Sequence, residues 1–228
     1  MRNAPVSEKA PVGVFVGLAT LDVIHRIAKA PAVNQKITST AQFVAAGGPA
    51  ANAAVTFAGL GGDAILVTAL GDDPVAELIR ADLAAYGVSV VDAGRWKAVM
   101  SDIVPYATDM VCSNDFRMPG ADNPESTAAA LVRSGVRTVV TTHGGDPVEW
   151  WSQGESGSVP VEPVVVVDTL GAGDAFHGAY SYFSTQMTSS VAERIDRSAR
   201  VAALRCSVVG PRAWLSELHM EKTRKRER

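Results

Sequence analysis

The sequence has little cysteine and no long apolar run. Its two cysteines, Cys112 and Cys206, lie far apart and form no CxxC pair. This spacing supports neither a zinc site nor a disulfide framework, so two reduced thiols are expected. No apolar run reaches the roughly 18 residues that a membrane span requires, and residues 1–11 lack the apolar core of a secretory signal. The expectation is a cytoplasmic protein that does not enter a membrane.

An excess of charge of one sign is also missing. Lysine and arginine number 21 against 24 aspartates and glutamates, which gives a formal net charge of −3. Nucleic-acid binding usually needs a strongly basic surface, so no nucleic-acid partner is expected. Hydrophobic residues make up 47% and charged residues 20% of the chain, which excludes a wholly disordered protein. A length of 228 residues predicts one domain.

Several common catalytic motifs are absent as well. There is no GxxxxGK[ST] phosphate loop, no GxSxG nucleophile turn and no HExxH zinc motif. The late glycines fall at 171, 173 and 178, which does not match GxGxxG, so a nicotinamide-dependent oxidoreductase is poorly supported. The four histidines show no metal-ligand spacing and are read as packing or surface residues.

What is present is an alternation of strand-like and helix-like segments, which predicts an α/β fold. Val12–Leu18 is typical of a buried first strand, and Asp22 would follow just past its carboxyl end. Helices are expected after Pro49 and after Pro74, each closed by glycine. Further strands are predicted at 36–44, 64–70, 90–93, 110–113, 136–142 and 164–167, with a hairpin of strands 148–151 and 159–163. Helices are predicted at 97–104, 126–134 and 191–206, and another is opened by the segment that begins at Asp168 and runs to about Thr185.

The segment Asp168–Asp174, DTLGAGD, follows the last apolar strand and opens a helix. Its glycines would let the backbone turn tightly, with the N–H groups of Ala172, Gly173 and Asp174 pointing outward as an anion hole for a phosphoryl group. Asp174 at the edge of that hole could accept a proton from an attacking hydroxyl. The alternative is an ordinary glycine turn with an acidic residue in the first turn of the helix.

Two motifs together carry a family resemblance. GGPAANAA, from Gly47, and DTLGAGDAFHGA, from Asp168, resemble the signatures of the PfkB, or ribokinase-like, carbohydrate kinases over about residues 12–215. The resemblance implies a three-layer α/β/α fold with a mostly parallel central sheet. It makes Asp174 the catalytic base and Gly171, Ala172 and Gly173 the anion hole. By the same resemblance, Asp22, Gly47, Gly48 and Asn52 contact the sugar, and Ser113, Thr142 and Gly144 contact the nucleotide, with residues 199–210 flanking the adenine.

The resemblance also implies ATP and Mg²⁺, and a monovalent cation that members of the family often use near the anion hole. The ligands of the metal are not assigned, because the family's NxxE motif departs here. Its place reads Ser113-Asn114-Asp115-Phe116, so Ser and Phe stand where the family has Asn and Glu. Asp115 could substitute through a water molecule.

A second departure shortens the chain near residues 88–92. GVSV from Gly87 runs directly into VDAGRWK, where the family has further strands and α/β units, including part of a lid over the sugar. At about 30 residues for each βαβ unit, roughly two units are missing. A parallel sheet that lacks inner strands must rearrange or expose edges. Members often dimerise through the lid, so a homodimer and irregular association through open edges are both expectations. Residues 221–228 form a charged tail.

These observations lead to an ATP-dependent kinase that phosphorylates a sugar hydroxyl. The segments 92–97 and 113–120 resemble a ketose-kinase branch that includes sulfofructose kinases, which favours a ketose or a modified hexose. A nucleoside kinase is one alternative. A non-catalytic relative that binds nucleotide, disabled by the shortening, is the other.

Overall fold

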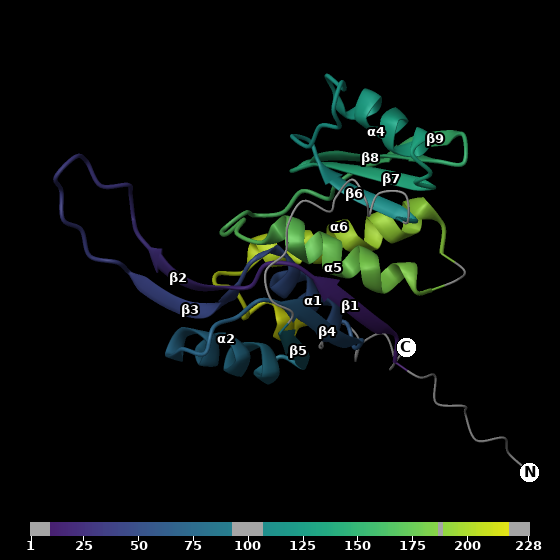
Figure 1. Ribbon diagram of the computed structural model, residues 1–228. Coiled ribbons are helices and arrows are strands. Elements are labelled where there is room, and N and C mark those ends of the chain that lie inside the picture. The colour runs from purple at the N-terminus through teal and green to yellow at the C-terminus, as the bar shows by residue number, and fades with distance from the viewer. Residues whose placement is uncertain (1–9, 93–106, 187–188, 219–228) are drawn as a thin grey trace, which may run out of the picture. The chain divides into compact units, whose positions relative to one another are not determined.

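The computed structural model describes residues 10–92, 107–186 and 189–218 (Figure 1). The chain divides into two compact units, which are described separately below. The first comprises Met1–Ala93 and Leu215–Arg228, and the second Gly94–Trp214. Within the described ranges, no helix combines the length and the apolar character needed to cross a membrane.

A three-stranded parallel sheet forms the centre of the first unit. Its order is β1-β4-β5, with β1 at Val12–Val16, β4 at Asp63–Thr68 and β5 at Val88–Asp92. Phe57 of the first helix packs on one face of this sheet, with its ring centroid 5.4 Å from that of Phe15. Leu66 on the same face is fully buried. The face is apolar because alternate residues of parallel strands point to the same side.

Two helices of this unit begin and end where the sequence predicts. α1 spans Pro49–Gly59 and α2 spans Pro74–Ala85, each with proline in its first turn. Asp73 caps α2 by accepting a hydrogen bond from the Ala76 N–H at 2.8 Å, which satisfies one of the unpaired donors of a helix start. Gly61 and Gly87 follow the two helices with φ of 92° and 75°, a conformation that favours glycine.

The first strand differs from the prediction that it is buried. Val12, Val14 and Val16 remain 55–60% exposed on the face of β1 opposite Phe15. Alternate side chains of a strand point to opposite faces, and these valines lie on the face opposite the one where Phe15 packs against Phe57.

An antiparallel ribbon of two strands completes the first unit (Figure 1). β2 spans Thr20–Arg26 and β3 spans Ala41–Gly47, with Thr20 opposite Gly47 and Arg26 opposite Ala41. The sequence predicted a strand at 36–44 and did not predict β2. Asp22 therefore lies inside a strand rather than in the loop after β1. A two-stranded ribbon with little burial has a weak hydrophobic pattern, which explains the miss.

The second unit is a three-layer arrangement around a four-stranded sheet of order β6-β7-β8-β9. β6 and β7 are parallel, and the two remaining pairs are antiparallel. One layer holds α4, whose Ala128 and Leu131 pack with Cys112 and Val139. On the opposite side, Phe176 and Tyr180 of α5 and Ile195 of α6 pack with Val140 and Val148. The bounds are β6 Asp109–Ser113, α4 Pro124–Arg133, β7 Thr138–His143, β8 Asp146–Ser152, β9 Glu155–Val159, α5 Ala172–Ser184 and α6 Val191–Ser207.

Two predictions for this unit are corrected. The second hairpin strand lies at Glu155–Val159 instead of 159–163, and 164–167 is not a strand. Val165 is 82% exposed, and the Val167 N–H donates to the Cys206 carbonyl at the end of α6. A run of β-branched residues favours a strand only where a neighbouring strand offers pairing. The helix predicted at 97–104 and the charged tail at 221–228 lie outside the described residues.

Candidate active site

The glycine turn before α5 opens the helix, as its sequence predicts. Gly171 is the residue before the helix and adopts a left-handed conformation with φ 75° and ψ 13°. Its carbonyl accepts the first helical hydrogen bond, from the Ala175 N–H at 2.9 Å. The helix therefore begins at Ala172, and Asp174 stands in its first turn. The N-terminus of a helix carries partial positive charge, which suits a phosphoryl group.

The backbone donors of this turn are used unequally. The Ala172 N–H donates to the Thr169 carbonyl at 3.1 Å, so it is engaged within the turn rather than turned outward as predicted. No described residue accepts a hydrogen bond from the Gly173 N–H. A Cβ placed on Gly173 would meet no atom within 4 Å. Gly173 therefore leaves open space beside a helix N-terminus, which is what the close approach of an anion requires.

A cavity of about 530 Å³ adjoins this turn. It brings together Thr142 and Gly144, from the end of β7, with Ala172 and Gly173 of the turn. Its volume lies within the range of about 300–1,000 Å³ that is usual for small-molecule sites. The remaining walls are mainly apolar and come from β8, the segment after β9, and helices α5 and α6: Gly145, Val148, Val161, Glu162, Pro163, Val164, Val166, Thr169, Phe176, Ala199, Ala202, Ala203 and Cys206.

Ser113 lies next to this cavity without lining it. It is the last residue of β6 and stands opposite Thr142 in the parallel register of β6 and β7. Both residues are therefore at the carboxyl ends of adjacent strands, where open α/β sheets bind their ligands. The Asn114 N–H donates to the Thr142 carbonyl at 2.9 Å, which fixes the chain leaving β6 beside the end of β7.

The residues predicted to contact a sugar gather in the first unit. Asp22 lies directly over Gly47, because a methyl group added at Gly47 would overlap its carboxylate. The Thr20 hydroxyl donates to Asp22 Oδ1 at 2.9 Å and holds that carboxylate. Gly48 precedes α1 with φ 93°, and a Cβ there would lie 2.5 Å from the Leu18 carbonyl oxygen. Asn52 follows one turn later, with its N–H donating to the Gly48 carbonyl at 3.0 Å.

Comparison with known proteins decides the family. The model of the pfkB family of carbohydrate kinases matches residues 13–95 and 92–217. The chain belongs to this family. A protein from Agrobacterium tumefaciens assigned as a ribokinase has the same fold, with a TM-score of 0.79 at 21% identity over 96% of this chain and 100% of that one. The ribokinase-like α/β fold is thereby confirmed.

Individual members of the pfkB family show more limited sequence similarity. Deoxyribokinase of Salmonella typhi is 30% identical over 83 residues, which is 36% of this chain and 27% of the relative. Adenosine kinase of Saccharomyces cerevisiae is 30% identical over 130 residues, which is 51% of this chain and 38% of the relative. A structure from E. coli assigned as ribokinase II, in complex with ATP and Mg²⁺, matches with a TM-score of 0.67 at 16% identity, over 95% of this chain and 100% of that one. The matches to the two curated relatives thus span less than two fifths of each relative's length.

Two residues outside the pfkB signatures also shape the site. Arg205 of α6, which the sequence analysis did not single out, is 3% exposed and pairs with Asp168 Oδ2 at 3.2 Å. Cys206 lines the cavity, and burial raises the pKa of its thiol, with a smaller opposing effect of Arg205 and a smaller raising effect of Asp168. Neither residue stands in a recognisable motif, because their contacts depend on how α6 ends beside the turn.

The described residues contain no group of three or more His, Cys, Asp or Glu side chains that could hold a metal ion. Mg²⁺ does not need such a group, because it is commonly bound through one or two carboxylates together with water and substrate phosphates. Asp115 follows β6, Asp174 stands in the first turn of α5, and Asp168 of the glycine turn before that helix is paired with Arg205. Arg117, considered as a contact for an anionic sugar substituent, instead donates to the carbonyls of Asn114 and Phe116. Arg95 and Lys97, considered for the same role, lie outside the described residues.

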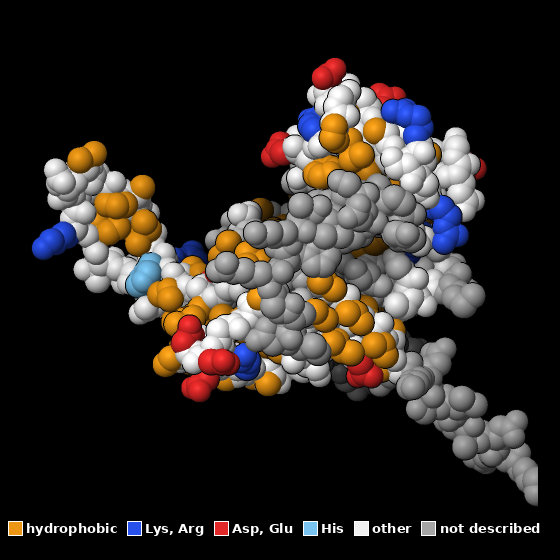
Figure 2. Space-filling model, viewed as in Figure 1, with side chains coloured by type: hydrophobic (Ala, Val, Ile, Leu, Met, Phe, Trp, Pro, Cys, Tyr) orange, Lys and Arg blue, Asp and Glu red, His pale blue; other side chains and the backbone are white. Residues whose placement is uncertain are grey.

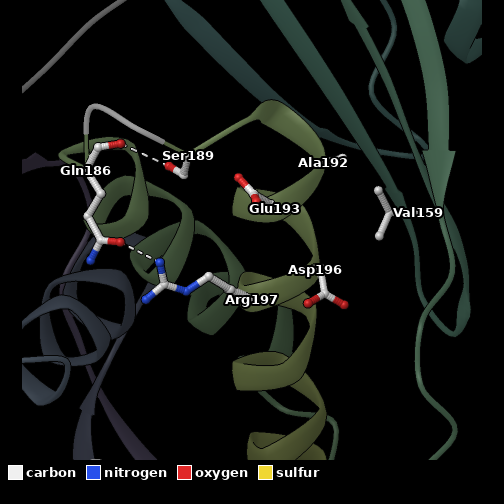
Figure 3. Close-up of a pocket in the computed structure, with 7 residues that line it drawn as sticks. All are labelled: Val159, Gln186, Ser189, Ala192, Glu193, Asp196 and Arg197. Atoms are coloured by element: carbon white, nitrogen blue, oxygen red, sulfur yellow. Dashed lines mark hydrogen bonds between the residues drawn. The ribbon is translucent and has the colours of Figure 1, made fainter.

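A second cavity of the same unit, about 610 Å³, is shown in Figure 3. Arg197 donates to the Gln186 side chain, and the Ser189 hydroxyl donates to the Gln186 carbonyl at 2.9 Å. Glu193 accepts from the Ser190 N–H at 2.8 Å as part of a helix cap. The polar groups here bond to one another and stabilise the start of α6. The cavity beside Gly173 is therefore the better candidate for a ligand.

Proposed function

We propose that this chain transfers the terminal phosphoryl group of ATP to a hydroxyl of a sugar. The observation that carries the proposal is the glycine turn at the start of α5, which lies on the wall of a cavity of about 530 Å³ and carries a carboxylate in the same helical turn. The pfkB match over most of the chain supports the same reaction. Phosphoryl transfer requires a helix N-terminus to stabilise the transferring group, a space for the nucleotide, and a base for the acceptor hydroxyl.

In this proposal each part has a role. Thr142 and Gly144 border the nucleotide, and Ser113 lies beside them at the end of β6. The turn Gly171–Gly173 receives the transferring phosphoryl group, with the Gly173 N–H as donor. Asp174 takes the proton of the acceptor hydroxyl. The acceptor oxygen forms a bond to the terminal phosphorus, the bond to the bridging oxygen breaks, and ADP leaves.

Mg²⁺, when bound, would neutralise charge that develops on the transferring group. Asp115 is the carboxylate that we assign to it, through a water molecule, and Asp174 stays the base. The departure from NxxE leaves Ser113 and Phe116 without a carboxylate, so Asp115 is the acidic residue of this segment that could take that role.

We assign acceptor binding to Asp22, Gly47, Gly48 and Asn52. Asp and Asn side chains hydrogen-bond hydroxyl groups, and adjacent glycines let a sugar lie close to the backbone. A ketose or a modified hexose is the favoured acceptor, from the segments 92–97 and 113–120. A nucleoside is the second candidate, which is favoured by the similarity to adenosine kinase over 51% of the chain.

The shortening near residues 88–92 belongs to the same proposal. The family model matches in two pieces that meet at residues 92–95, as expected if a single ribokinase-like domain has lost internal units there.

A homodimer through the β2–β3 ribbon would cover Val23 and Val44, which are about half exposed, and Figure 2 shows hydrophobic side chains along this ribbon. Sedimentation equilibrium would test that assembly. The cytoplasmic location stays a prediction from the sequence.

The deciding test is ADP release from ATP and Mg²⁺ across ketoses, aldoses and nucleosides, with Asp174→Asn beside the wild type. One acceptor should give release, and the variant should lose roughly 10²–10⁴-fold in kcat while it still binds ATP. Asp122→Asn, an exposed residue before α4, is the matched control and should retain full activity. Unchanged activity in Asp174→Asn would remove the assigned base. A folded protein that binds ATP but releases no ADP with any acceptor would be a non-catalytic relative.

A further inference from the structure

A buried arginine lies beside the first residue of the turn Asp168–Asp174, which we call the phosphate turn. Arg205, in the last turn of α6, is 3% exposed. Its Nη2 lies 3.2 Å from Asp168 Oδ2, and its Nη1 donates to the carbonyls of Asp168 at 3.4 Å and Val208 at 3.2 Å. One guanidinium thus contacts a carboxylate oxygen and two backbone oxygens of two segments. Asp168 is the first residue of the phosphate turn, so the positive charge of Arg205 contacts that turn directly.

The oxygens around Arg205 are otherwise already bonded. Asp168 Oδ1 accepts from the Leu170 N–H at 3.0 Å, and Oδ2 also accepts from the Gly210 N–H at 3.2 Å. The Cys206 carbonyl accepts from the N–H groups of Val167 and Asp168. Carbonyl oxygens at the end of a helix carry partial negative charge and favour a cation. Arg205 supplies that cation from within α6.

The family resemblance implies a monovalent cation near the anion hole. Such an ion binds where carbonyl and carboxylate oxygens can replace its hydration shell. At the foot of this turn, the oxygens that would serve are bonded to a guanidinium or to backbone N–H groups. The residues present therefore do not fit a bound monovalent cation at this place, because a second positive charge would have to displace Arg205.

We propose that the guanidinium of Arg205 is the fixed cation of the phosphate turn, and that this chain uses it in place of a potassium or sodium ion. Arg205 is a positioning residue: it touches neither the nucleotide cavity nor the reacting atoms, and it acts by holding Asp168 and hence the turn that ends at Gly173. The expected effect of Arg205 on catalysis rests on the proposed kinase activity. Its expected effects on stability and on cation binding are independent of that activity.

The test compares potassium chloride with tetramethylammonium chloride at equal ionic strength, because tetramethylammonium is too large for such a site. For the wild type, the melting temperature should agree within about 1 °C between the two salts, since a bound ion would raise it. The rate of ADP release should agree within about twofold. Potassium that raises either quantity beyond these limits overturns the proposal. A wild type without kinase activity refutes the proposed function, and the melting temperature still decides the cation question.

Variants of Arg205 give the second arm. Arg205→Met should lower the melting temperature by roughly 3–12 °C, because it leaves the partly buried carboxylate of Asp168 without its cation. Activity in tetramethylammonium should fall about tenfold, below the 10²-fold or more of a lost direct donor. Potassium should restore most of both losses, because the freed oxygens can then hold the ion. Arg200→Met is the matched control on the exposed side of the same helix and should respond to neither salt.

A merely structural ion pair predicts a different result. In that case Arg205→Met would be destabilised equally in both salts, and this outcome overturns the proposal. If Arg205→Met does not fold, Arg205→Lys keeps the positive charge and should melt lower than the wild type but equally in the two salts. An Arg205→Lys protein that potassium stabilises would also count against the proposal.

Discussion

Replacing Gly171 and Gly173 of the phosphate turn one at a time should have different effects: the first change should lower stability, and the second should weaken nucleotide binding. Gly171 has φ 75°, and a non-glycine residue in this left-handed region costs about 1–2 kcal/mol. Alanine also restricts the unfolded chain, which returns about 0.4–1 kcal/mol. The net loss for Gly171→Ala is therefore about 1 kcal/mol, and the melting temperature of a chain of this size should fall by about 2–4 °C.

Gly173→Ala should behave in the opposite way. Gly173 lies inside the first turn of α5, where alanine is a better helix former than glycine by about 0.5–1 kcal/mol. The added Cβ meets no atom within 4 Å, so the fold accommodates it without strain. The same methyl group would project beside the N–H that we assign to the phosphate. Stability should be unchanged or slightly higher, while the Kd for ATP should rise at least about tenfold.

Gly154→Ala is the control for strain away from the cavity. Gly154 has φ 86° in the turn between β8 and β9, and a Cβ there also meets open space. It should lose about as much stability as Gly171→Ala and bind ATP as the wild type does. Melting by differential scanning fluorimetry and ATP titration by calorimetry would measure the two quantities. A Gly173→Ala protein with wild-type affinity would refute the phosphate assignment, and an unchanged melting temperature in Gly171→Ala would refute the strain argument.

Further predictions concern the acceptor residues and the thiols. Gly47→Ala would push the Asp22 carboxylate aside and should raise the KM of the sugar at least about tenfold, with the KM of ATP unchanged; equal effects on both would contradict the assignment. Iodoacetamide at mildly alkaline pH should modify Cys206 before Cys112, as followed by mass spectrometry. ATP should slow the modification of Cys206 only, because that thiol lines the cavity. Burial raises the pKa of Cys112 from 9.0 to about 11, so the unfolded thiol ionises first. Its contribution to stability is complete below pH 9.0 and is lost as the pH rises to about 11, and Cys112→Ala should flatten this decline in urea unfolding.

Local sequence predicted the parts of this protein that local interactions determine. Pro49 and Asp73-Pro74 mark the starts of α1 and α2, because a proline in the first turn and a capping carboxylate act within one turn of helix. The glycine turn before α5 was predicted for the same reason, since Gly171 alone supplies the left-handed residue that starts the helix. The paired signatures then indicated the family.

Tertiary structure decided what depends on residues far apart in the chain. Asp22 was expected in a loop, but its pairing with β3 places it in a strand over Gly47. The run at 164–167 reads as a strand but has no partner strand and instead borders the cavity. Asp168 and Arg205 are 37 residues apart. No local pattern reveals that they pair, because the contact requires the end of α6 to lie beside the turn that begins at Asp168. The sequence alone thus determined where helices begin and what chemistry the turn can offer, while long-range packing determined which oxygens that turn leaves free.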